Sequence, residues 1–159
     1  MLGSNEVRRV ASILLVALAL PLLAPASARA DHLPGPCDRH REEGETVRSQ
    51  MKRIIRCAVE RWEVPDGARR AICIADRESN LDPKAESAHG EYLGLYQHSA
   101  EAWPDRYAEW SHPSWQLPDN ALHGRSNAVV TVRMVNANGW GPWESLGCDG
   151  GDRRAQALR

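Results

Sequence analysis

The sequence predicts a mainly α-helical protein of the α+β class with one small β-hairpin. Two observations predict this class: apolar residues recur at helical spacing in the segments 46–62 and 68–78, and a glycine-rich stretch with alternating apolar residues, 82–100, follows them. The chain has 159 residues, and domains of about 100 to 150 residues are the commonest. We therefore expect one domain with a modest core.

Residues 1–30 have the pattern of a secretory signal peptide. Arg8 and Arg9 precede the apolar run 10–20, and residues 28–30 form a small-residue cleavage pattern. Two prolines interrupt the apolar stretch, which is shorter than the ~20 residues that a membrane-spanning helix needs. We therefore expect cleavage rather than a retained anchor, a secreted or extracytoplasmic protein, and no stable membrane insertion after the signal is removed.

Charge and cysteine content narrow the function classes. The formal net charge is −1, so nucleic acid is not an expected partner. All four cysteines follow residue 30, where an oxidising compartment favours two disulfides, and none forms a C-x-x-C pair. That spacing argues against a zinc site and against a thioredoxin-like redox site. The histidines His89, His98, His112 and His123 lack close pairing on a helical face, so we expect no metal and no cofactor.

Local patterns predict the first elements. Residues 31–45 are rich in Pro, Gly and charge and predict an irregular lead-in that Cys37 pins down. Residues 46–62 predict a helix, and its domain is expected to span 46–148, before a polar tail at 149–159. The apolar residues that recur at helical spacing are Val47, Met51, Ile54, Ile55, Ala58 and Trp62.

A second helix is expected from Ala68 to Glu78. The turn at 64–67 precedes it, and Asp66 in that turn can cap the helix by accepting a hydrogen bond from its free N–H groups. Asn80 and Pro83 bring the helix to an end. Its predicted buried residues are Ala71, Ile72 and Ala75.

Glu78 thus lies at a helix C-terminus. A carboxylate there faces the negative end of the helix dipole, which disfavours its ionised form and raises its pKa. Such a position suits a proton donor.

The rest of the chain predicts a hairpin, short helical pieces and a last helix. Residues 82–100 predict a loop or short hairpin, in which strand alternation places Tyr92 and Tyr96 on one face, both in or both out. Residues 103–125 predict loops with short helical pieces. The segment 126–137 is rich in valine but predicts a helix, because Asn138-Gly139 is a good helix stop.

The positions of five of the six tryptophans predict two different environments. Trp140 and Trp143 are expected in the core or as supports of a lid. Trp103, Trp110 and Trp115 lie in the loop-rich region and are better candidates for exposed ligand contacts.

Two motifs carry a resemblance to a known family. Residues 78–85, ESNLDPKA, and residues 90–97, GEYLGLYQ, resemble the E-S-x-x-D/N-P-x-A and G-L-x-Q signatures of the lysozyme-like lytic transglycosylases. Residues 139–143, GWGPW, with a cysteine soon after, resemble the end of the resuscitation-promoting-factor domains, a secreted branch of the same superfamily. The resemblance covers roughly residues 68–148.

This resemblance implies a lysozyme-like fold with the hairpin beside a cleft, and an enzyme of the cell wall that cleaves peptidoglycan glycan strands. The bond implied is the β-1,4 bond between N-acetylmuramic acid and N-acetylglucosamine, with Glu78 as catalytic acid and base. Glycosidic cleavage does need a carboxylic acid that stays protonated near neutral pH. The resemblance also implies that Cys73 pairs with Cys148, which leaves Cys37 with Cys57.

Hydrolysis would require a second carboxylate opposite the acid. Glu91 is the nearest candidate, and Asp105 is the next, which keeps a hydrolytic muramidase open as an alternative. Lytic transglycosylases do without this group, because the N-acetyl and 6-hydroxyl groups of the substrate complete the reaction and give a 1,6-anhydro product. We favour this non-hydrolytic cleavage, and the other rival is an inactive wall-binding or interaction protein.

The expected substrate-binding residues are Ser79, Glu91, Tyr92, Tyr96 and Gln97. Gln97 matches the motif glutamine, whose amide either binds sugar groups or satisfies backbone groups of the hairpin. The two tyrosines could line the groove, since aromatic rings stack on the apolar faces of sugars, although either could belong to the core. Ser79 is expected to orient Glu78 or to cap backbone carbonyls rather than to act as a nucleophile.

Overall fold

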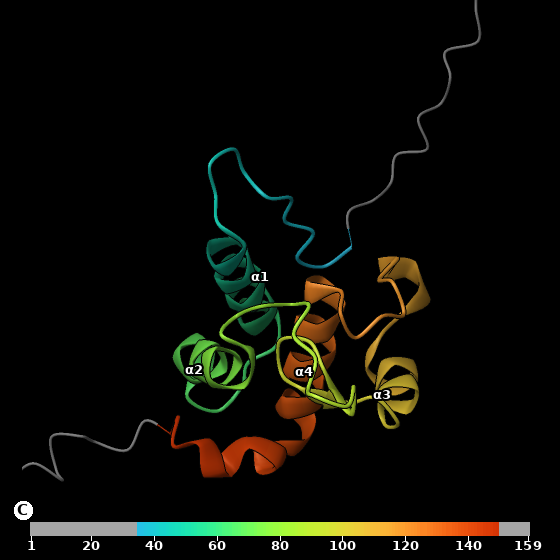
Figure 1. Cartoon of the computed structure of the whole chain (residues 1–159). Coiled ribbons are helices and arrows are strands. Elements are labelled where there is room, and N and C mark those ends of the chain that lie inside the picture. Colours follow the sequence, from blue (N-terminus) through green and yellow to red (C-terminus); the bar gives the residue numbers. More distant parts are fainter. Residues whose placement is uncertain (1–34, 150–159) are drawn as a thin grey trace, which may run out of the picture. The chain divides into compact units, whose positions relative to one another are not determined.

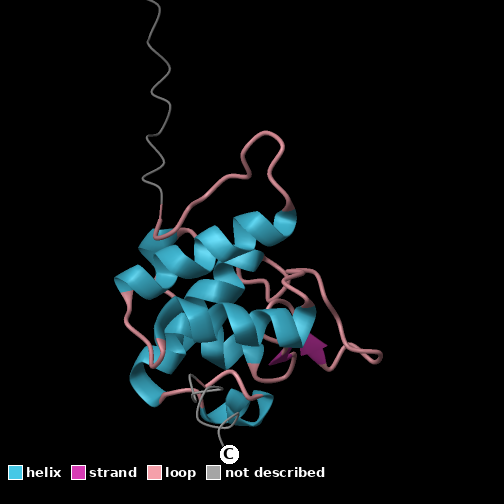
Figure 2. Ribbon diagram, turned by 90° about the vertical axis from the view of Figure 1, so that its left-hand side faces the viewer, coloured by secondary structure: helices cyan, strands magenta, loops and turns pink. Residues whose placement is uncertain are grey.

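The computed structural model describes residues 35–149, and this part of the chain is mainly helical. Figure 1 shows the helices α1 (Val47–Arg61), α2 (Gly67–Ser79), α3 (Trp103–Trp110) and α4 (Gly124–Asn138). Two short 3-10 helices, η1 (Pro113–Trp115) and η2 (Gly141–Leu146), and the antiparallel strands β1 (Tyr92–Leu93) and β2 (His98–Ser99) complete it. In Figure 2 the strands lie toward one edge of the helical body. The predicted mainly α-helical class with one small antiparallel hairpin is confirmed.

The predicted signal segment, 1–30, and the tail beyond residue 149 lie outside the described residues. Within the described part, no helix is long and apolar enough to cross a membrane.

Helix α1 forms where its apolar spacing predicts it. Thr46 caps its N-terminus, because the side chain accepts a hydrogen bond of 3.1 Å from the backbone N–H of Ser49. The helix packs against both α2 and α4. Its face toward them is buried and consists of Met51, Ile54, Ile55, Ala58 and Val59.

Helix α4 is the central helix, with α1 on one side and α3 on the other. It is buried almost continuously from Gly124 to Val135, including its polar residues. A helix that is buried on every side shows no clear apolar stripe, and valine also favours strands, which explains why this segment suited both structures. Gly139 ends it with a positive φ of 75°, as the Asn-Gly pair predicts.

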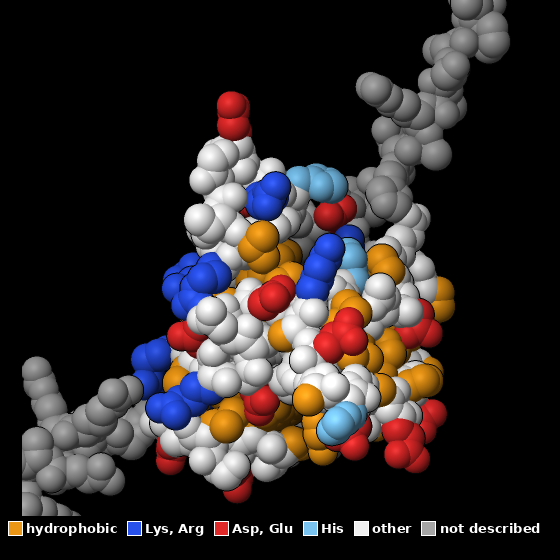
Figure 3. Space-filling view, viewed as in Figure 1, with side chains coloured by type: hydrophobic (Ala, Val, Ile, Leu, Met, Phe, Trp, Pro, Cys, Tyr) orange, Lys and Arg blue, Asp and Glu red, His pale blue; other side chains and the backbone are white. Residues whose placement is uncertain are grey.

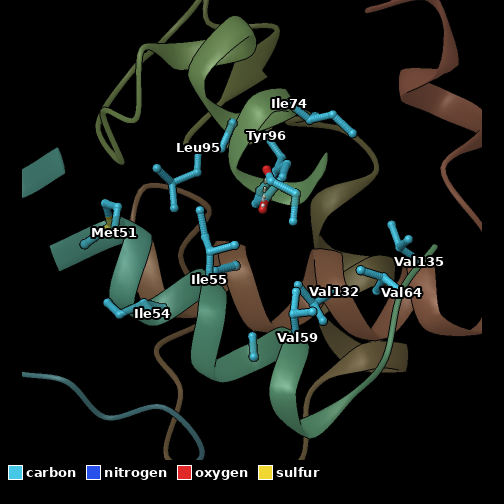
Figure 4. Close-up of a cluster of buried hydrophobic side chains, with 14 of the residues drawn as sticks. Met51, Ile54, Ile55, Val59, Val64, Ile74, Leu95, Tyr96, Val132 and Val135 are labelled. Atoms are coloured by element: carbon cyan, nitrogen blue, oxygen red, sulfur yellow. Dashed lines mark hydrogen bonds between the residues drawn. The ribbon is translucent and has the colours of Figure 1, made fainter. Parts of the chain in front are cut away.

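The main core joins α1, α2, the hairpin turn and α4 (Figure 4). Ile55 from α1, Ile74 from α2 and Tyr96 from the turn are fully buried there. A smaller cluster holds Trp103, Ala121 and Val130 between α3 and α4. The buried hairpin turn therefore belongs to the core and is not a surface loop.

Two details of α2 differ from the prediction. Asp66 occupies the cap position, but its side chain makes no capping bond and instead forms an ion pair of 3.0 Å with Arg70. Ile72 is only partly buried, whereas Ile74 is fully buried. The buried face of α2 is 71, 74, 75 and 79, because residues three and four apart share one side of a helix.

Both disulfides form as the resemblance implies. Cys37 bonds to Cys57, which ties the lead-in to α1, and Cys73 bonds to Cys148, which ties α2 to the segment after η2. The Cα atoms of the two pairs are 5.6 and 5.8 Å apart, within the usual range for a disulfide.

The hairpin pairs Tyr92 with Ser99 and Leu93 with His98. Between the strands, Gly94 has a positive φ of 76°, and a Cβ atom there would lie 2.2 Å from the carbonyl oxygen of Ala121. Only glycine fits this turn.

The prediction that Tyr92 and Tyr96 share a face was wrong. Tyr92 is 49% exposed and Tyr96 is fully buried. Strand alternation ends at Leu93, and residues 94–97 form a turn that reverses the direction of the side chains.

Of Trp103, Trp110 and Trp115, the candidates for exposed ligand contacts, Trp103 contradicts the prediction. Trp103 is buried and donates a hydrogen bond of 2.9 Å from Nε1 to Asp119, and the other two are partly buried. Trp103 is buried because α3 packs against α4, where the ring contacts Ala121 and Val130. Trp140 and Trp143 are buried, as predicted.

The surface seen in Figure 3 carries charges of both signs. Lys and Arg gather toward its left edge, on the side of α1 and α2, while Asp and Glu gather at the lower right, near α3. Hydrophobic side chains show between them, so the charge on this face is patterned and not uniform.

Candidate active site

Glu78 lies in the last turn of α2, and its side chain is partly buried. Burial raises the pKa of its carboxyl group above the usual value of 4.5. The direction predicted for this pKa is therefore confirmed, and its cause is burial of the carboxyl group.

Arg48 contacts the C-terminal end of α2, close to Glu78 in the sequence. Its guanidinium donates a hydrogen bond of 2.6 Å to the carbonyl oxygen of Asn80 and forms an ion pair of 2.8 Å with Asp76. A cation at a helix C-terminus offsets the negative end of the dipole. The end of α2 is thus held by a side chain from α1.

Glu78 lines a pocket of about 350 Å³ to which four parts of the chain contribute. α2 supplies Glu78, the hairpin supplies three residues, α3 supplies one, and η2 supplies two. The lining residues are Glu78, Tyr92, Gln97, Ser99, Arg106, Pro142 and Trp143. Three of them were predicted as site residues, and four were not.

Tyr92 and Gln97 therefore share the pocket with Glu78. The ring of Tyr92 is half exposed, which leaves it accessible to a ligand. Gln97 donates from Nε2 to the carbonyl oxygens of Gly94, at 3.0 Å, and Ala85, at 3.2 Å. The side-chain nitrogen of Gln97 thus stabilises the hairpin, which is the second of the two roles predicted for it. Its side-chain oxygen remains to accept a hydrogen bond from a ligand.

Ser79 and Tyr96 do not line the pocket. Ser79 is buried, and its Oγ lies 2.9 Å from the carbonyl oxygens of Ala75 and Leu95. Tyr96 is fully buried and donates a hydrogen bond of 3.1 Å to the carbonyl oxygen of Ala71. Both hydroxyls satisfy backbone carbonyls of the core, so neither side chain is placed to contact a ligand in this pocket. The alternative predictions, Ser79 as a cap of backbone carbonyls and one tyrosine in the core, match these positions.

Glu91 and Asp105 are both exposed, and neither lines the pocket. Glu78 is the one carboxylate among the pocket-lining residues of the described chain. The second carboxylate that hydrolysis would need is therefore not provided at this pocket by the residues predicted for it.

A network of hydrogen bonds between polar side chains lies behind the pocket, and the sequence did not predict it. Nη1 of Arg106 lies 2.7 Å from Nδ1 of His98, and Nε2 of His98 lies 2.6 Å from Oγ1 of Thr131. Oγ1 of Thr131 donates its proton to the carbonyl oxygen of Asn127, at 2.7 Å, so it accepts from His98. His98 thus carries its proton on Nε2 and accepts from Arg106 on Nδ1.

His98 is neutral in this chain of bonds. Its complete burial and the charge of Arg106 lower its pKa to about 3. The three residues come from β2, α3 and α4, and no periodic pattern in the sequence links them, so no local signal could have found the network.

Trp143 forms the apolar wall of the pocket. Its Nε1 donates a hydrogen bond of 3.1 Å to the carbonyl oxygen of Tyr96, and its ring lies edge-on to His98, with 5.7 Å between centroids. The disulfide at Cys148 holds the segment after it to α2. The fold therefore fixes this wall relative to Glu78.

A second pocket, of about 340 Å³, lies between the lead-in and the start of α4. Its charged lining is mainly basic and includes Arg39, Arg41 and Lys84. Its single acidic residue, Asp38, lies 3.6 Å from the guanidinium of Arg125. Since the one carboxyl group of this second pocket is engaged by an arginine, the pocket at Glu78 is the candidate active site.

Comparison of this chain with protein-family models, with curated proteins and with solved structures gave no match.

Proposed function

We propose that this protein is a peptidoglycan lytic transglycosylase with a lysozyme-like fold. It acts outside the cytoplasm, at the cell wall, on the β-1,4 bond between N-acetylmuramic acid and N-acetylglucosamine. The observation that carries the proposal is a partly buried carboxyl group with a raised pKa, Glu78, in a pocket whose described lining has no other carboxylate. The two disulfides support an oxidising compartment.

Glu78 acts first as an acid. Its protonated carboxyl donates a proton to the oxygen of the leaving N-acetylglucosamine while positive charge develops at C1 of the muramic acid residue. Burial suits this step, because it keeps the proton on Glu78 at a higher pH than an exposed glutamate would.

Glu78 then acts as a base. Its carboxylate takes the proton of the C6 hydroxyl of the same muramic acid residue as that oxygen bonds to C1. The product is a 1,6-anhydro sugar, no water is consumed, and Glu78 returns to its protonated form. A single carboxylate is sufficient for this cycle, which fits a pocket that neither Glu91 nor Asp105 lines.

The other pocket residues position the sugar. The exposed ring of Tyr92 offers a stacking surface, and the buried ring of Trp143 offers an apolar wall. The side-chain oxygen of Gln97 accepts a hydrogen bond from a sugar hydroxyl or an N-acetyl N–H, while its nitrogen stays fixed by two backbone carbonyls.

The test is the mass-spectrometric analysis of muropeptides released from purified peptidoglycan by the wild-type protein and by Glu78→Gln. We expect 1,6-anhydro ends from the wild type and a loss of about 100-fold or more in Glu78→Gln. Urea denaturation should show that the variant still folds. Glu91→Gln is the matched control, since this carboxylate is exposed and outside the pocket, and it should retain full activity.

The same experiment separates the rivals. Reducing ends in place of anhydro ends would identify a hydrolytic muramidase. If the wild type and Glu78→Gln release equally little while both bind peptidoglycan, the protein is a wall-binding protein and not an enzyme.

A further inference from the structure

Arg106 differs from the other partly or fully buried arginines of the described chain. Six arginines between residues 35 and 149 are at least partly buried, and four of these form ion pairs with carboxylates. Arg133 lies over the rings of Trp62 and Trp115 and donates to the carbonyl oxygen of Trp110. The four that pair with carboxylates are Arg48, Arg53, Arg70 and Arg125.

Arg106 has neither kind of partner within residues 35–149. Among these residues its guanidinium makes one hydrogen bond, to Nδ1 of His98, which is neutral and leaves the positive charge uncompensated. Burial of a charge without a counter-ion is costly, and here it lowers the pKa of the guanidinium. The charge nevertheless faces the pocket that Glu78 lines.

The contact with His98 orients Arg106 without neutralising it. One nitrogen of the guanidinium donates to His98, and His98 is itself held by Thr131 on the buried helix α4. A guanidinium has five N–H donors in a planar fork, so the others are left for a ligand. A planar fork that is fixed at one corner is well suited to bind a carboxylate with two parallel hydrogen bonds.

We propose that Arg106 is a carboxylate-binding subsite that selects muramic acid over N-acetylglucosamine in the pocket. The inference rests on the proposed function, and it goes beyond it by naming the group that the enzyme recognises. Muramic acid differs from N-acetylglucosamine by a lactyl ether, whose carboxyl group is either free or joined to a stem peptide that has carboxylates of its own. The free form presents its carboxylate directly beside the ring that carries the scissile bond, and the peptide-bearing form presents carboxylates further along the stem.

Trp143 and Tyr92 cannot make this distinction. Aromatic and apolar surfaces contact the faces of both sugars equally, and the acid Glu78 acts on the bridging oxygen that both share. Arg106 is the one cationic residue of the pocket lining in the described chain, so specificity for an acidic sugar depends on it.

The test measures binding of three glycans to the Glu78→Gln protein by isothermal titration calorimetry. The first glycan is a chito-oligosaccharide without carboxylates, the second is a glycan strand freed of peptides, and the third is the same strand with its stem peptides. Each is measured again after Arg106→Gln and after Arg106→Lys have been added. Since Glu78→Gln removes cleavage, the readout is binding alone.

We expect Arg106→Gln to weaken binding of at least one carboxylate-bearing strand roughly 10- to 100-fold, the usual range for a charge-assisted hydrogen-bonded pair. Binding of the chito-oligosaccharide should not change. Arg106→Lys should be intermediate, because it keeps the charge but loses the fork. The strand that shows the loss identifies the carboxylate: the peptide-free strand indicates the lactyl group, and the intact strand indicates the stem peptide.

An equal loss for all three glycans, no loss for any, or no binding of any glycan to the Glu78→Gln protein would overturn the inference. These outcomes are distinct from failure of the proposed function, which is judged separately by the products of the wild-type protein. Urea denaturation of Arg106→Gln, with a midpoint near that of the parent protein, ensures that a loss of binding is not a loss of folding.

Discussion

The disulfide between Cys73 and Cys148 joins the helix that carries Glu78 to the segment that follows Trp143, with the two Cα atoms 5.8 Å apart. Helix α2 and η2 also pack against each other. The acid and one wall of its pocket are therefore held by a covalent bond between positions that are 75 residues apart in the sequence.

This relationship predicts that the two disulfides differ in their importance for activity. A disulfide lowers the conformational entropy of the unfolded chain. A bond that closes a loop of 75 residues raises the free energy of the unfolded state by about 4 kcal/mol, and one that closes a loop of 20 residues raises it by about 3 kcal/mol. We expect the double variant Cys73→Ala with Cys148→Ala to lose stability and activity. The matched variant Cys37→Ala with Cys57→Ala should lose stability but keep most of its activity below its unfolding midpoint. Urea denaturation and muropeptide release measure the two effects, and an equal loss of activity in both would contradict the prediction.

The raised pKa of Glu78 predicts an increase in stability when its charge is removed. Below the usual pKa of 4.5 the carboxyl is protonated in both the folded and the unfolded state, so the stability that the neutral carboxyl gives the folded protein is fully present. As the pH rises through the raised folded pKa, this stability is lost, because the folded state then has to bury an anion. We therefore expect Glu78→Gln to be more stable than the wild type at pH 7 and to lose this advantage near pH 4.

The measurement is the urea midpoint of both proteins between pH 4 and pH 8. Glu91→Gln serves as the control, since Glu91 is exposed, and it should follow the wild type throughout. A constant difference between Glu78→Gln and the wild type across this range would show that burial of Glu78 does not govern its ionisation.

His98 predicts a pH dependence of the opposite sign. Its folded pKa of about 3 lies below the usual 6.5, so its contribution to stability is complete above pH 6.5 and is lost as the pH falls toward 3. Within that window the loss is about 1.4 kcal/mol per pH unit. We expect His98→Gln to be about 1 to 3 kcal/mol less stable than the wild type at pH 7, because it disrupts buried hydrogen bonds.

The decisive comparison is the slope of stability against pH. His98→Gln should have a shallower slope than the wild type between pH 6 and pH 4, so the two curves should converge on acidification. His89→Gln replaces an exposed histidine and should keep the wild-type slope. Parallel curves for His98→Gln and the wild type would argue against a buried, neutral His98.

The two tyrosines of the hairpin predict a separation of binding from stability. Tyr92→Ala removes an exposed ring from the pocket, so KM should rise about 5-fold, equivalent to about 1 kcal/mol, while the urea midpoint stays almost unchanged. Tyr96→Phe removes a buried hydroxyl that bonds to Ala71, so it should cost about 1 kcal/mol of stability without changing KM. Steady-state kinetics and urea denaturation of both variants measure the two effects. A higher KM for Tyr96→Phe, or a lower urea midpoint for Tyr92→Ala, would contradict the prediction.

The sequence by itself determined where α1, α2 and α4 form and where α2 and α4 end. Helix α1 follows its apolar spacing, and α2 and α4 end where Asn80 and Gly139 predict, because those residues adopt positive φ angles more readily than most. The position of Glu78 at the end of α2 follows from the same local rules. The disulfide pairing came from family resemblance, since spacing alone leaves other pairings open.

Only the tertiary structure decided which side chains meet. The turn at 94–97 buries Tyr96 and exposes Tyr92, and α3 covers Trp103, although strand alternation and local composition predicted otherwise. The contact between Arg106 and His98 depends on how α3 and the hairpin pack against α4, and long-range packing leaves no periodic mark in a single sequence. Propensity and spacing act over a few residues, whereas a pocket is assembled from parts of the chain that are distant in sequence, which is why the acid was predictable and its surroundings were not.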